Sequence, residues 1–293
     1  MSELPTCGLI GLGRLGRTLA LAFHRRGCLR FVKGRSHEHA HWAHTHALPY
    51  ADRWEELPPV ELLWLTVPDH QIATVVAECI HALGLQFLRQ TSLVHTAGSL
   101  GGEPFQPWAG ELRWGCAHPF QTFPLPPQPQ LLRCIGWLIE SPHAQTQQQL
   151  ATVVRALDGI PIVLAHIDAQ RRALYHAAAV VASNALVAIL LLARQLARRA
   201  NIPDALFLQP IASTALSNVF ASPGPPPLTG PIVRGDWDTL QRHLQALSPA
   251  EAEAYGHLLA AIGSIARQHN LLLPEHYSRL LELLNRFPTN TEG

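Results

Sequence analysis

Three glycines near the start of the chain, Gly11, Gly13 and Gly16, are spaced as G-x-G-x-x-G. They follow an apolar run at 6–10 and open a stretch with helical spacing at 14–26. In such a turn the first glycine permits a tight bend, the second lets backbone approach a pyrophosphate, and the third lets helix pack on strand. The helix N-terminus adds an anion site. The residues expected to contact a dinucleotide here are Gly11, Leu12, Gly13, Arg14, Leu15 and Gly16.

The next apolar run, 29–32, ends on the letters KGRS at 33–36. An NAD site usually has Asp or Glu at this point for the ribose hydroxyls, whereas the 2′-phosphate of NADP needs cations and hydroxyls. No carboxylate occurs between Glu3 and Glu38. The sequence therefore predicts NADP as the cofactor, although these side chains are also typical of a solvated loop. The residues expected around the 2′-phosphate are Lys33, Arg35 and Ser36.

The segment TVPDHQI, residues 66–72, follows another apolar run and provides a second edge of the cofactor site. Because cofactors lie at the carboxyl ends of parallel strands, this segment is expected to lie against the dinucleotide. The predicted contacts are Thr66, Val67, Pro68 and Ile72.

The elements that must position these residues alternate between strand and helix up to about residue 165. The expected strands are 6–10, 29–32, 62–67, 92–95, 112–117, 134–139 and 160–164. Strands separated by crossover helices favour a doubly wound parallel sheet. Strand signals stop at Asp168, which is expected to cap a long helix. We therefore predict an α/β Rossmann-like NADP-binding domain at 1–166 and an all-α substrate and dimerisation domain at 167–293.

The long helix offers His176, Ser183 and Asn184, whose spacings of seven and eight residues keep them near one helix face. An imidazole could protonate a carbonyl or imine that receives hydride, and an asparagine amide could hold its oxygen or nitrogen. A histidine hydrogen-bonded in a helix core is the alternative. His176 and Asn184 are candidate catalytic residues, and Ser183 a candidate substrate contact.

His118 is the competing acid, because HPF at 118–120 follows a strand where it could face the nicotinamide. His95 ends another strand and is a candidate substrate contact, and the alternative is a histidine that only orders the following loop. Arg234 and Asp236 could clamp a substrate carboxylate or amine, while Asp236 could equally be a helix N-cap.

The segment HEHAHWAHTH at 37–46 contains five histidines. If it is helical, His37, His41 and His44 share a face that zinc or nickel could use. It occupies the usual place of the second helix of a nucleotide-binding domain, and no carboxylate constellation accompanies it. A solvated helix face is therefore expected, with no metal site.

The balance of charges and the apolar stretches exclude several partners. The net charge is +1 with no basic half, which argues against nucleic acid. The apolar stretch at 177–193 is interrupted by Ser183 and Asn184 and falls short of the ~20 residues of a membrane span. It is expected in a core or at a homodimer interface. Five widely spaced cysteines favour neither a disulfide framework nor a metal cluster, and a reducing cytoplasm is expected.

Several stretches besides the glycine loop resemble one family: VHTAGSL (94–100), AHPFQTFP (117–124), YHAAAVVASNAL (175–186), LTGPIVRGD (228–236) and QRHLQAL (241–247). They are similar to Rossmann-like proteins with a C-terminal domain of unknown function 2520, oxidoreductases akin to pyrroline-5-carboxylate reductase and ketopantoate reductase. The resemblance implies a helical domain like the C-terminal domain of 6-phosphogluconate dehydrogenase, pairing between subunits. Wider relatives use a lysine and an asparagine on the first long helix of that domain. Lys33 is the only lysine here, so a lysine mechanism in the helical domain is excluded.

Together these features predict an NADP-dependent oxidoreductase that transfers hydride to or from a small keto or imino compound. The alternative is a non-catalytic sensor that binds NADP and reports through its helical domain.

Overall fold

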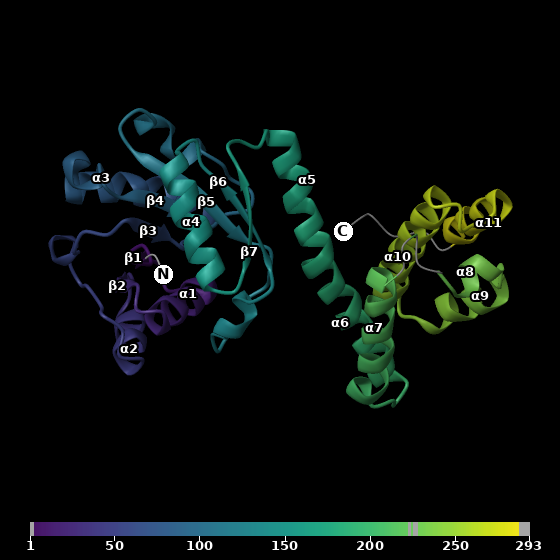
Figure 1. The fold of residues 1–293 in the computed structure, drawn as a ribbon. Helices are drawn as coiled ribbons and strands as arrows, with labels where there is room; N and C mark the ends of the chain where they lie inside the picture. Colours follow the sequence, from purple (N-terminus) through teal and green to yellow (C-terminus); the bar gives the residue numbers. More distant parts are fainter. Residues whose placement is uncertain (1–2, 222–223, 225–227, 287–293) are drawn as a thin grey trace. The chain divides into compact units, whose positions relative to one another are not determined.

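The computed structural model describes residues 3–221, 224 and 228–286, and its fold is drawn in Figure 1. The chain groups into two compact units, Met1–Ala185 and Leu186–Gly293. The first unit is an α/β fold, and the described part of the second is helical. The predicted fold class, a Rossmann-like sheet followed by an all-α region, is confirmed.

Seven strands form one sheet in the order β2-β1-β3-β4-β5-β6-β7. The strands are β1 (Cys7–Ile10), β2 (Leu29–Lys33), β3 (Leu62–Leu65), β4 (Ser92–His95), β5 (Arg113–Pro119), β6 (Gly136–Glu140) and β7 (Ile160–Leu164). Every residue of β1, β3 and β4 is buried, as in parallel sheets covered on both faces. The register pairs Ile10 with Leu65 and Leu65 with His95, so these three strands end level with one another.

One strand pair departs from the predicted parallel arrangement. Strands β1 to β5 are parallel, but β6 runs antiparallel to β5, and β7 is parallel to β6. A parallel return needs a long crossover, usually a helix. The connection between β5 and β6 has only the 3₁₀ turn η4 (Pro129–Leu132), whereas β6 and β7 are joined through a full helix. The sheet is therefore mostly parallel, with its last two strands reversed.

The helices of the first unit are α1 (Arg14–Arg25), α2 (His37–Thr45), α3 (Ile72–Leu88), α4 (Ala144–Ala156) and α5 (Ala169–Val180). Helices α1, α3 and α4 pack on the sheet, while β7 at its edge stays largely exposed. One buried cluster joins α1 and α4 to the face that includes Trp64 and Trp137. Another joins α3 to the opposite face through Leu63 and Leu65. This layering leaves the carboxyl ends of the strands as the edge on which loops can hold a ligand.

The second unit contains α6 (Leu186–Arg199), α7 (Asp204–Ala221), α8 (Pro231–Arg234), α9 (Trp237–Ala246), α10 (Pro249–Gln268) and α11 (Pro274–Asn285). Its apolar core is built by α8 to α11, around side chains such as Leu240, Leu259 and Leu280. By contrast, α6 and α7 have no buried residue. The core of this unit therefore lies in its last four helices.

The boundary between the two units along the chain falls within a continuous helical stretch. Asp168 caps α5 by accepting from the Arg171 backbone N–H at 2.8 Å, as predicted. Helical residues then continue to Arg199 through the π-helical turn η5 (Val181–Ala185). The sequence predicts a boundary near residue 166 because strand signals end there. The first compact unit extends to Ala185 and so includes α5.

Two helical stretches of the described residues are long and apolar enough to cross a membrane by length and composition alone: Asp69–Leu88 and Ala169–Arg199. The first is the α3 segment, which is partly buried against the sheet. No residue of the 18-residue apolar window in the second is buried. This continuous helix is longer than the apolar stretch at 177–193 that the sequence pattern marks.

Candidate functional site

The three glycines of the first turn meet three different surroundings. Gly11 has a φ of +102°, and a Cβ there would lie 2.7 Å from the Thr66 carbonyl oxygen. A Cβ at Gly16 would overlap the Gly11 carbonyl oxygen. A Cβ at Gly13 would meet nothing within 4 Å, because this glycine faces open space at the N-terminus of α1. The loop therefore has the form of a phosphate cradle that a side chain at residue 13 would fill.

A cavity of about 570 Å³ extends from this loop along the carboxyl ends of β1, β2 and β3. It is lined by Ile10, Gly11, Leu12, Gly13, Lys33, Gly34, Arg35, His39, Trp54, Thr66, Val67, Pro68, Gln71, Val75 and Glu78. The structure thus brings eight of the expected cofactor contacts together: Gly11, Leu12, Gly13, Lys33, Arg35, Thr66, Val67 and Pro68.

The other expected contacts have different positions. Ser36 caps α2, accepting from the His39 backbone N–H at 3.3 Å. Ile72 is fully buried in the core, and Gly16 packs beneath the loop. Arg14 and Leu15 begin α1 outside the cavity lining.

Two cations that line the cavity, Lys33 and Arg35, each have partners in the protein. The Lys33 ammonium donates to the Asp52 carbonyl and lies 5.3 Å from the centre of the Trp54 ring. Partial burial lowers the pKa of Lys33, and the nearby carboxylates, first of them Asp52, oppose this. Arg35 donates to Gln71 Oε1 at 2.9 Å and lies 3.7 Å from a Glu78 oxygen.

His39 lines the cavity, although the sequence pattern predicts no contact with the cofactor for this member of the histidine-rich segment 37–46. Its Nδ1 accepts from the Arg35 backbone N–H at 3.3 Å, and a Cβ at Gly34 would overlap its ring. Burial lowers the pKa of His39, and the Arg17 guanidinium adds to this. The signal that could have found it is the Ser36 cap, which places residue 39 in the first turn of α2, beside the loop.

His95 lies at the carboxyl end of β4 with no exposed surface. Its Nδ1 accepts from the Ala97 N–H at 3.2 Å, and its Nε2 is 2.7 Å from the Gly101 carbonyl oxygen. Burial lowers its pKa to about 4. Both ring nitrogens are therefore used by the following loop, which favours the loop-ordering alternative over substrate contact.

His118 belongs to β5 and pairs with Tyr175 of α5, not with His176. Its Nδ1 lies 2.7 Å from the Tyr175 hydroxyl oxygen, and the two rings meet edge to face. A Cβ at Gly98 would lie 2.9 Å from the Nε2 edge of this imidazole, so the glycine of the VHTAGSL motif makes room for the ring. Burial lowers the pKa of His118 to about 4 and raises the pKa of Tyr175 well above its usual range. Both groups are uncharged at neutral pH.

A buried ion pair anchors α5 one turn before Tyr175. Arg172 pairs with Glu140 of β6 and also donates to the Leu100 carbonyl oxygen at 2.7 Å. Glu140 accepts as well from the Ile167 N–H at 3.0 Å. Because both charged side chains are almost fully buried, this pair holds the start of α5 firmly against the sheet.

The face proposed for His176, Ser183 and Asn184 assumes a regular α-helix, which the structure does not have. Ser183 and Asn184 lie in the π-helical turn η5, whose wider winding changes their rotation relative to His176. The Ser183 hydroxyl lies 2.6 Å from the Ala179 carbonyl oxygen and 3.0 Å from Asn184 Oδ1. The seven- and eight-residue spacings therefore do not define one face here.

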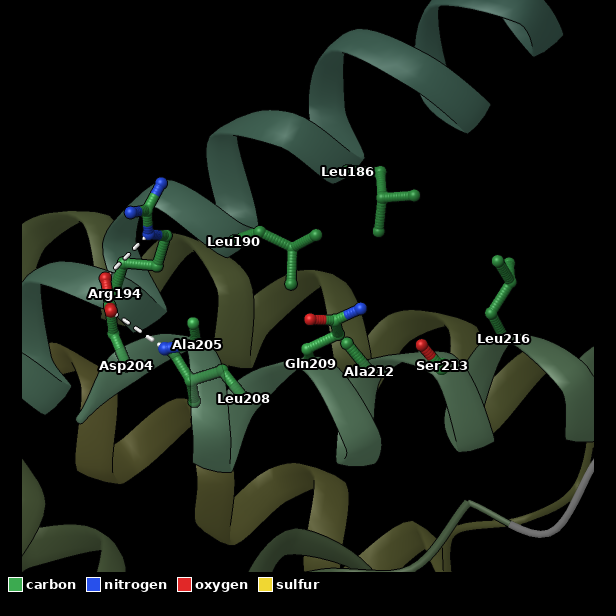
Figure 2. Close-up of a pocket in the computed structure, with 10 residues that line it drawn as sticks. All are labelled: Leu186, Leu190, Arg194, Asp204, Ala205, Leu208, Gln209, Ala212, Ser213 and Leu216. Carbon is green, nitrogen blue, oxygen red and sulfur yellow. Dashed lines mark hydrogen bonds and ion pairs between the residues drawn. The ribbon is translucent and has the colours of Figure 1, made fainter. Parts of the chain in front are cut away.

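In the second unit, Asp236 caps α9 by accepting from the Thr239 N–H at 3.2 Å, which is the N-cap alternative. Arg234 is exposed at the end of α8. A groove of about 350 Å³ lies between α6 and α7. Figure 2 draws the residues that line it: Leu186, Leu190, Arg194, Asp204, Ala205, Leu208, Gln209, Ala212, Ser213 and Leu216. Arg194 and Asp204 close one end of it with a 2.8 Å ion pair.

The histidine-rich segment forms α2, as expected, with His37, His41 and His44 exposed. Over 3–221, 224 and 228–286, no group of three His, Cys, Asp or Glu side chains is arranged to hold a metal ion.

Comparison with known proteins adds a family and several structures. Residues 135–262 match the family described as Domain of unknown function (DUF2520). A candidate NADP oxidoreductase from Bacteroides fragilis is similar over 87% of this chain and 96% of its own, with 26% identity and a TM-score of 0.72. A comparison with curated proteins finds none that matches.

Two reductases share the fold at lower identity. An imine reductase from a Pseudomonas species covers 96% of this chain and all of its own (100%), with 18% identity and a TM-score of 0.62. A pyrroline-5-carboxylate reductase from Coxiella burnetii covers 96% and 99%, with 15% identity and a TM-score of 0.57. These findings confirm the resemblance drawn from the sequence motifs.

Proposed function

We propose that this Rossmann-like chain with a DUF2520 domain is an NADP-dependent oxidoreductase acting on a small keto or imino compound. The observation that carries the proposal is the cavity in which the open Gly13 turn, Lys33 and Arg35 come together. An oxidoreductase role agrees with the similarity to the Bacteroides fragilis protein.

The lining of the cavity fits the parts of a dinucleotide phosphate. The free backbone N–H groups at the start of α1 suit the pyrophosphate, next to the unfilled space at Gly13. Arg35, Lys33 and His39 offer donors for the 2′-phosphate. Trp54 and Val75 offer apolar surface for the adenine ring. When bound, the nicotinamide supplies or accepts the hydride, and the chain orients the substrate and moves one proton.

A binding experiment tests the cofactor. NADPH should bind at least about tenfold more tightly than NADH, a difference of ~1.4 kcal/mol, in calorimetry. Arg35→Asp should narrow or reverse this preference, because it puts a carboxylate where the 2′-phosphate would lie. Arg30→Asp is the matched control: it makes the same charge change on β2 at an exposed residue outside the cavity lining. Equal affinities of the wild-type protein for NADH and NADPH would contradict the assignment.

A turnover experiment separates the enzyme from the sensor. Oxidation of NADPH is followed with a panel of small 2-keto acids and cyclic imines. Turnover of a panel member supports the oxidoreductase. Tight NADPH binding with no turnover across the panel would favour the sensor, which uses the same cavity without the chemistry.

We also propose that the chain forms a homodimer through its helical unit. The apolar side chains that α6 and α7 expose include Val187, Ile189, Leu191, Leu206, Phe207, Ile211, Val219 and Phe220. The groove of Figure 2 lies between the same two helices, and large exposed apolar patches mark interaction sites. A second copy of this chain would bury such a surface symmetrically.

A further inference from the structure

Two polar side chains outside the cofactor cavity are paired in a way that the binding of a dinucleotide does not require. His118 Nδ1 and the Tyr175 hydroxyl oxygen are 2.7 Å apart, and the Phe120 ring packs 5.1 Å from the Tyr175 ring. Both groups belong to the first unit, one on β5 and the other on α5. Neither the hydroxyl nor the imidazole is needed for the core, which is built from apolar side chains of the sheet and its helices.

The pair lies on the same edge of the sheet as the cofactor cavity. Pro68 lines that cavity, and the next residue, Asp69, accepts from the Ser99 hydroxyl at 2.5 Å. Gly98, beside Ser99, abuts the His118 ring. A continuous line of contacts therefore runs from the cavity to the pair along the carboxyl ends of β3, β4 and β5.

We propose that the Tyr175 hydroxyl is the proton donor of the reaction and that His118 positions it by donating from Nδ1 to the Tyr175 oxygen. This rests on the proposed oxidoreductase function. It differs from the sequence-based assignment, in which His118 or His176 gives the proton. Tyr175 is the catalytic residue of the pair, and His118 is a positioning residue.

The state of His118 favours this division of roles. With a pKa near 4, its imidazolium form is scarce at neutral pH, so this ring is a poor source of the proton. The groups that set its charge are His176 of α5, Asp69, His95 of β4 and Arg172 of α5, with burial as the largest cause. Tyr175 keeps its proton because burial raises its pKa. A phenol is still more acidic than an alcohol or an amine, so transfer to a developing alkoxide is downhill.

The proton step balances without a further reactant. As the C=O or C=N carbon receives hydride, the π electron pair moves to oxygen or nitrogen and forms a bond with the Tyr175 proton. The Oη–H bond breaks and its electron pair stays on Oη as tyrosinate. The His118 Nδ1–H stabilises this anion by its hydrogen bond, and solvent water then returns a proton to Oη.

The Arg172 anchor explains how the donor is held in place. It lies one turn before Tyr175 on the same helix, and its pairing with Glu140 and Leu100 fixes that turn against β6 and the loop after β4. The loop after β4 also contains Gly98. The Arg172–Glu140 pair therefore holds both the helix that carries Tyr175 and the loop that packs against the His118 ring.

The tautomer of His118 tests the proposal directly. The protein is labelled with ¹⁵N-histidine and measured by NMR with and without NADPH, and His118→Asn identifies the signals of residue 118. We expect a neutral ring with the proton on Nδ1 and a bare Nε2. A bare Nδ1 would overturn the proposal, because Tyr175 would then be donating its proton to the ring and not to a substrate. Failure of NADPH to bind would instead contradict the proposed function, while the ligand-free spectrum would still decide the tautomer.

Kinetics with a reactive member of the panel give the second test. Tyr175→Phe should lower kcat by ~10²–10⁴-fold, the range of a general acid, with NADPH affinity unchanged. His118→Asn places an amide N–H near the position of Nδ1 and should restore most of the activity that His118→Gln loses. A Tyr175→Phe variant within about threefold of the wild type, far below that range, would overturn the proposal.

Discussion

The central strands of the sheet unit and the first two helices of the helical unit differ in how far their apolar side chains are buried. In β1, β3 and β4 every residue is buried, because α1 and α4 cover one face and α3 the other. In α7, Leu206 is 71% exposed and Phe220 82% exposed. The central strands of the first unit are thus covered by helices of the same unit, although the edge strand β7 leaves Ile160 and Ile162 exposed. The helices α6 and α7 carry apolar surface that their own unit does not cover, which suits assembly more than catalysis.

The largest effect should come from charging the open surface. Leu206→Glu combined with Phe207→Glu should convert the proposed homodimer into a monomer, since two carboxylates would be buried unpaired at the interface. Light scattering at micromolar concentration measures the mass. A dimer that survives there has an association free energy of about 8 kcal/mol, so its loss is easily seen.

The control for this experiment is Arg242→Glu, an exposed change on α9 that should leave the dimer intact. A wild-type chain that is a monomer at micromolar concentration would contradict the homodimer. Binding of the wild-type chain to lipid vesicles would show that the apolar helix at 169–199 contacts lipid and not a second copy of the chain.

Breaking the buried Arg172–Glu140 ion pair should have the next largest effect, a loss of stability in the sheet unit. Arg172→Ala should lower the free energy of unfolding by about 3–5 kcal/mol, because Glu140 would remain as a buried charge without its partner. Urea denaturation followed by tryptophan fluorescence reports it through Trp64 and Trp137 of the sheet core. Arg171→Ala, at the exposed neighbouring residue, should change stability by less than about 0.5 kcal/mol. Equal losses in both variants would mean that the pair does not anchor α5.

Acid should weaken the sheet unit through its buried histidines. Burial lowers the pKa of His95 to about 4, whereas an unfolded histidine has a pKa of about 6.5. Between these pH values the unfolded chain binds a proton on His95 and the folded chain does not. The contribution of His95 to the free energy of unfolding is therefore complete above about pH 6.5 and is lost as the pH falls toward 4. About 2 kcal/mol should be lost by about pH 5 from His95 alone.

This contribution is measured as a difference in pH profiles of unfolding. His95→Gln should remove that part of the loss of unfolding free energy at acid pH. Some pH dependence should remain, because the pKa of His118 is also lowered to about 4. His41→Gln, at an exposed residue of α2, should leave the profile unchanged. An unaltered slope in His95→Gln would show that His95 titrates normally in the folded chain.

Substitutions in the glycine turn should have the smallest effects, and they separate stability from cofactor binding. Gly16→Ala should destabilise the fold by about 1–3 kcal/mol, because its Cβ would overlap the Gly11 backbone. Gly13→Ala should change stability by less than about 0.5 kcal/mol, since its Cβ meets no atom within 4 Å. Yet Gly13→Ala should weaken NADPH binding at least about tenfold in calorimetry, by ~1.4 kcal/mol, because the methyl group enters the phosphate cradle. Unchanged NADPH affinity in Gly13→Ala would place the pyrophosphate elsewhere.

Much of the fold and part of the cavity could be predicted because the signals are local. The strand and helix patterns gave the order of elements in the first unit, and Asp168 marked the start of the long helix. Eight expected cofactor contacts line one cavity, since the glycine turn and the two strand ends follow the same local rule. Ile72 and Ser36 lie outside that lining because being next to a turn in sequence does not determine which way a side chain faces.

Features that depend on neighbouring residues could be predicted from the chain: the glycine turn, the lack of an acid at the end of β2, the alternation of strands and helices, and the helices of the described part of the second unit. Packing between distant segments fixes the reversal of β6, the position of His39 in the cavity, and the pairing of His118 with Tyr175 across 57 residues of chain. These three features depend on the direction in which the chain re-enters the sheet and on which distant side chains come into contact when the elements pack. The π-helical turn shows the same limit, because one wider turn changes which residues share a helix face.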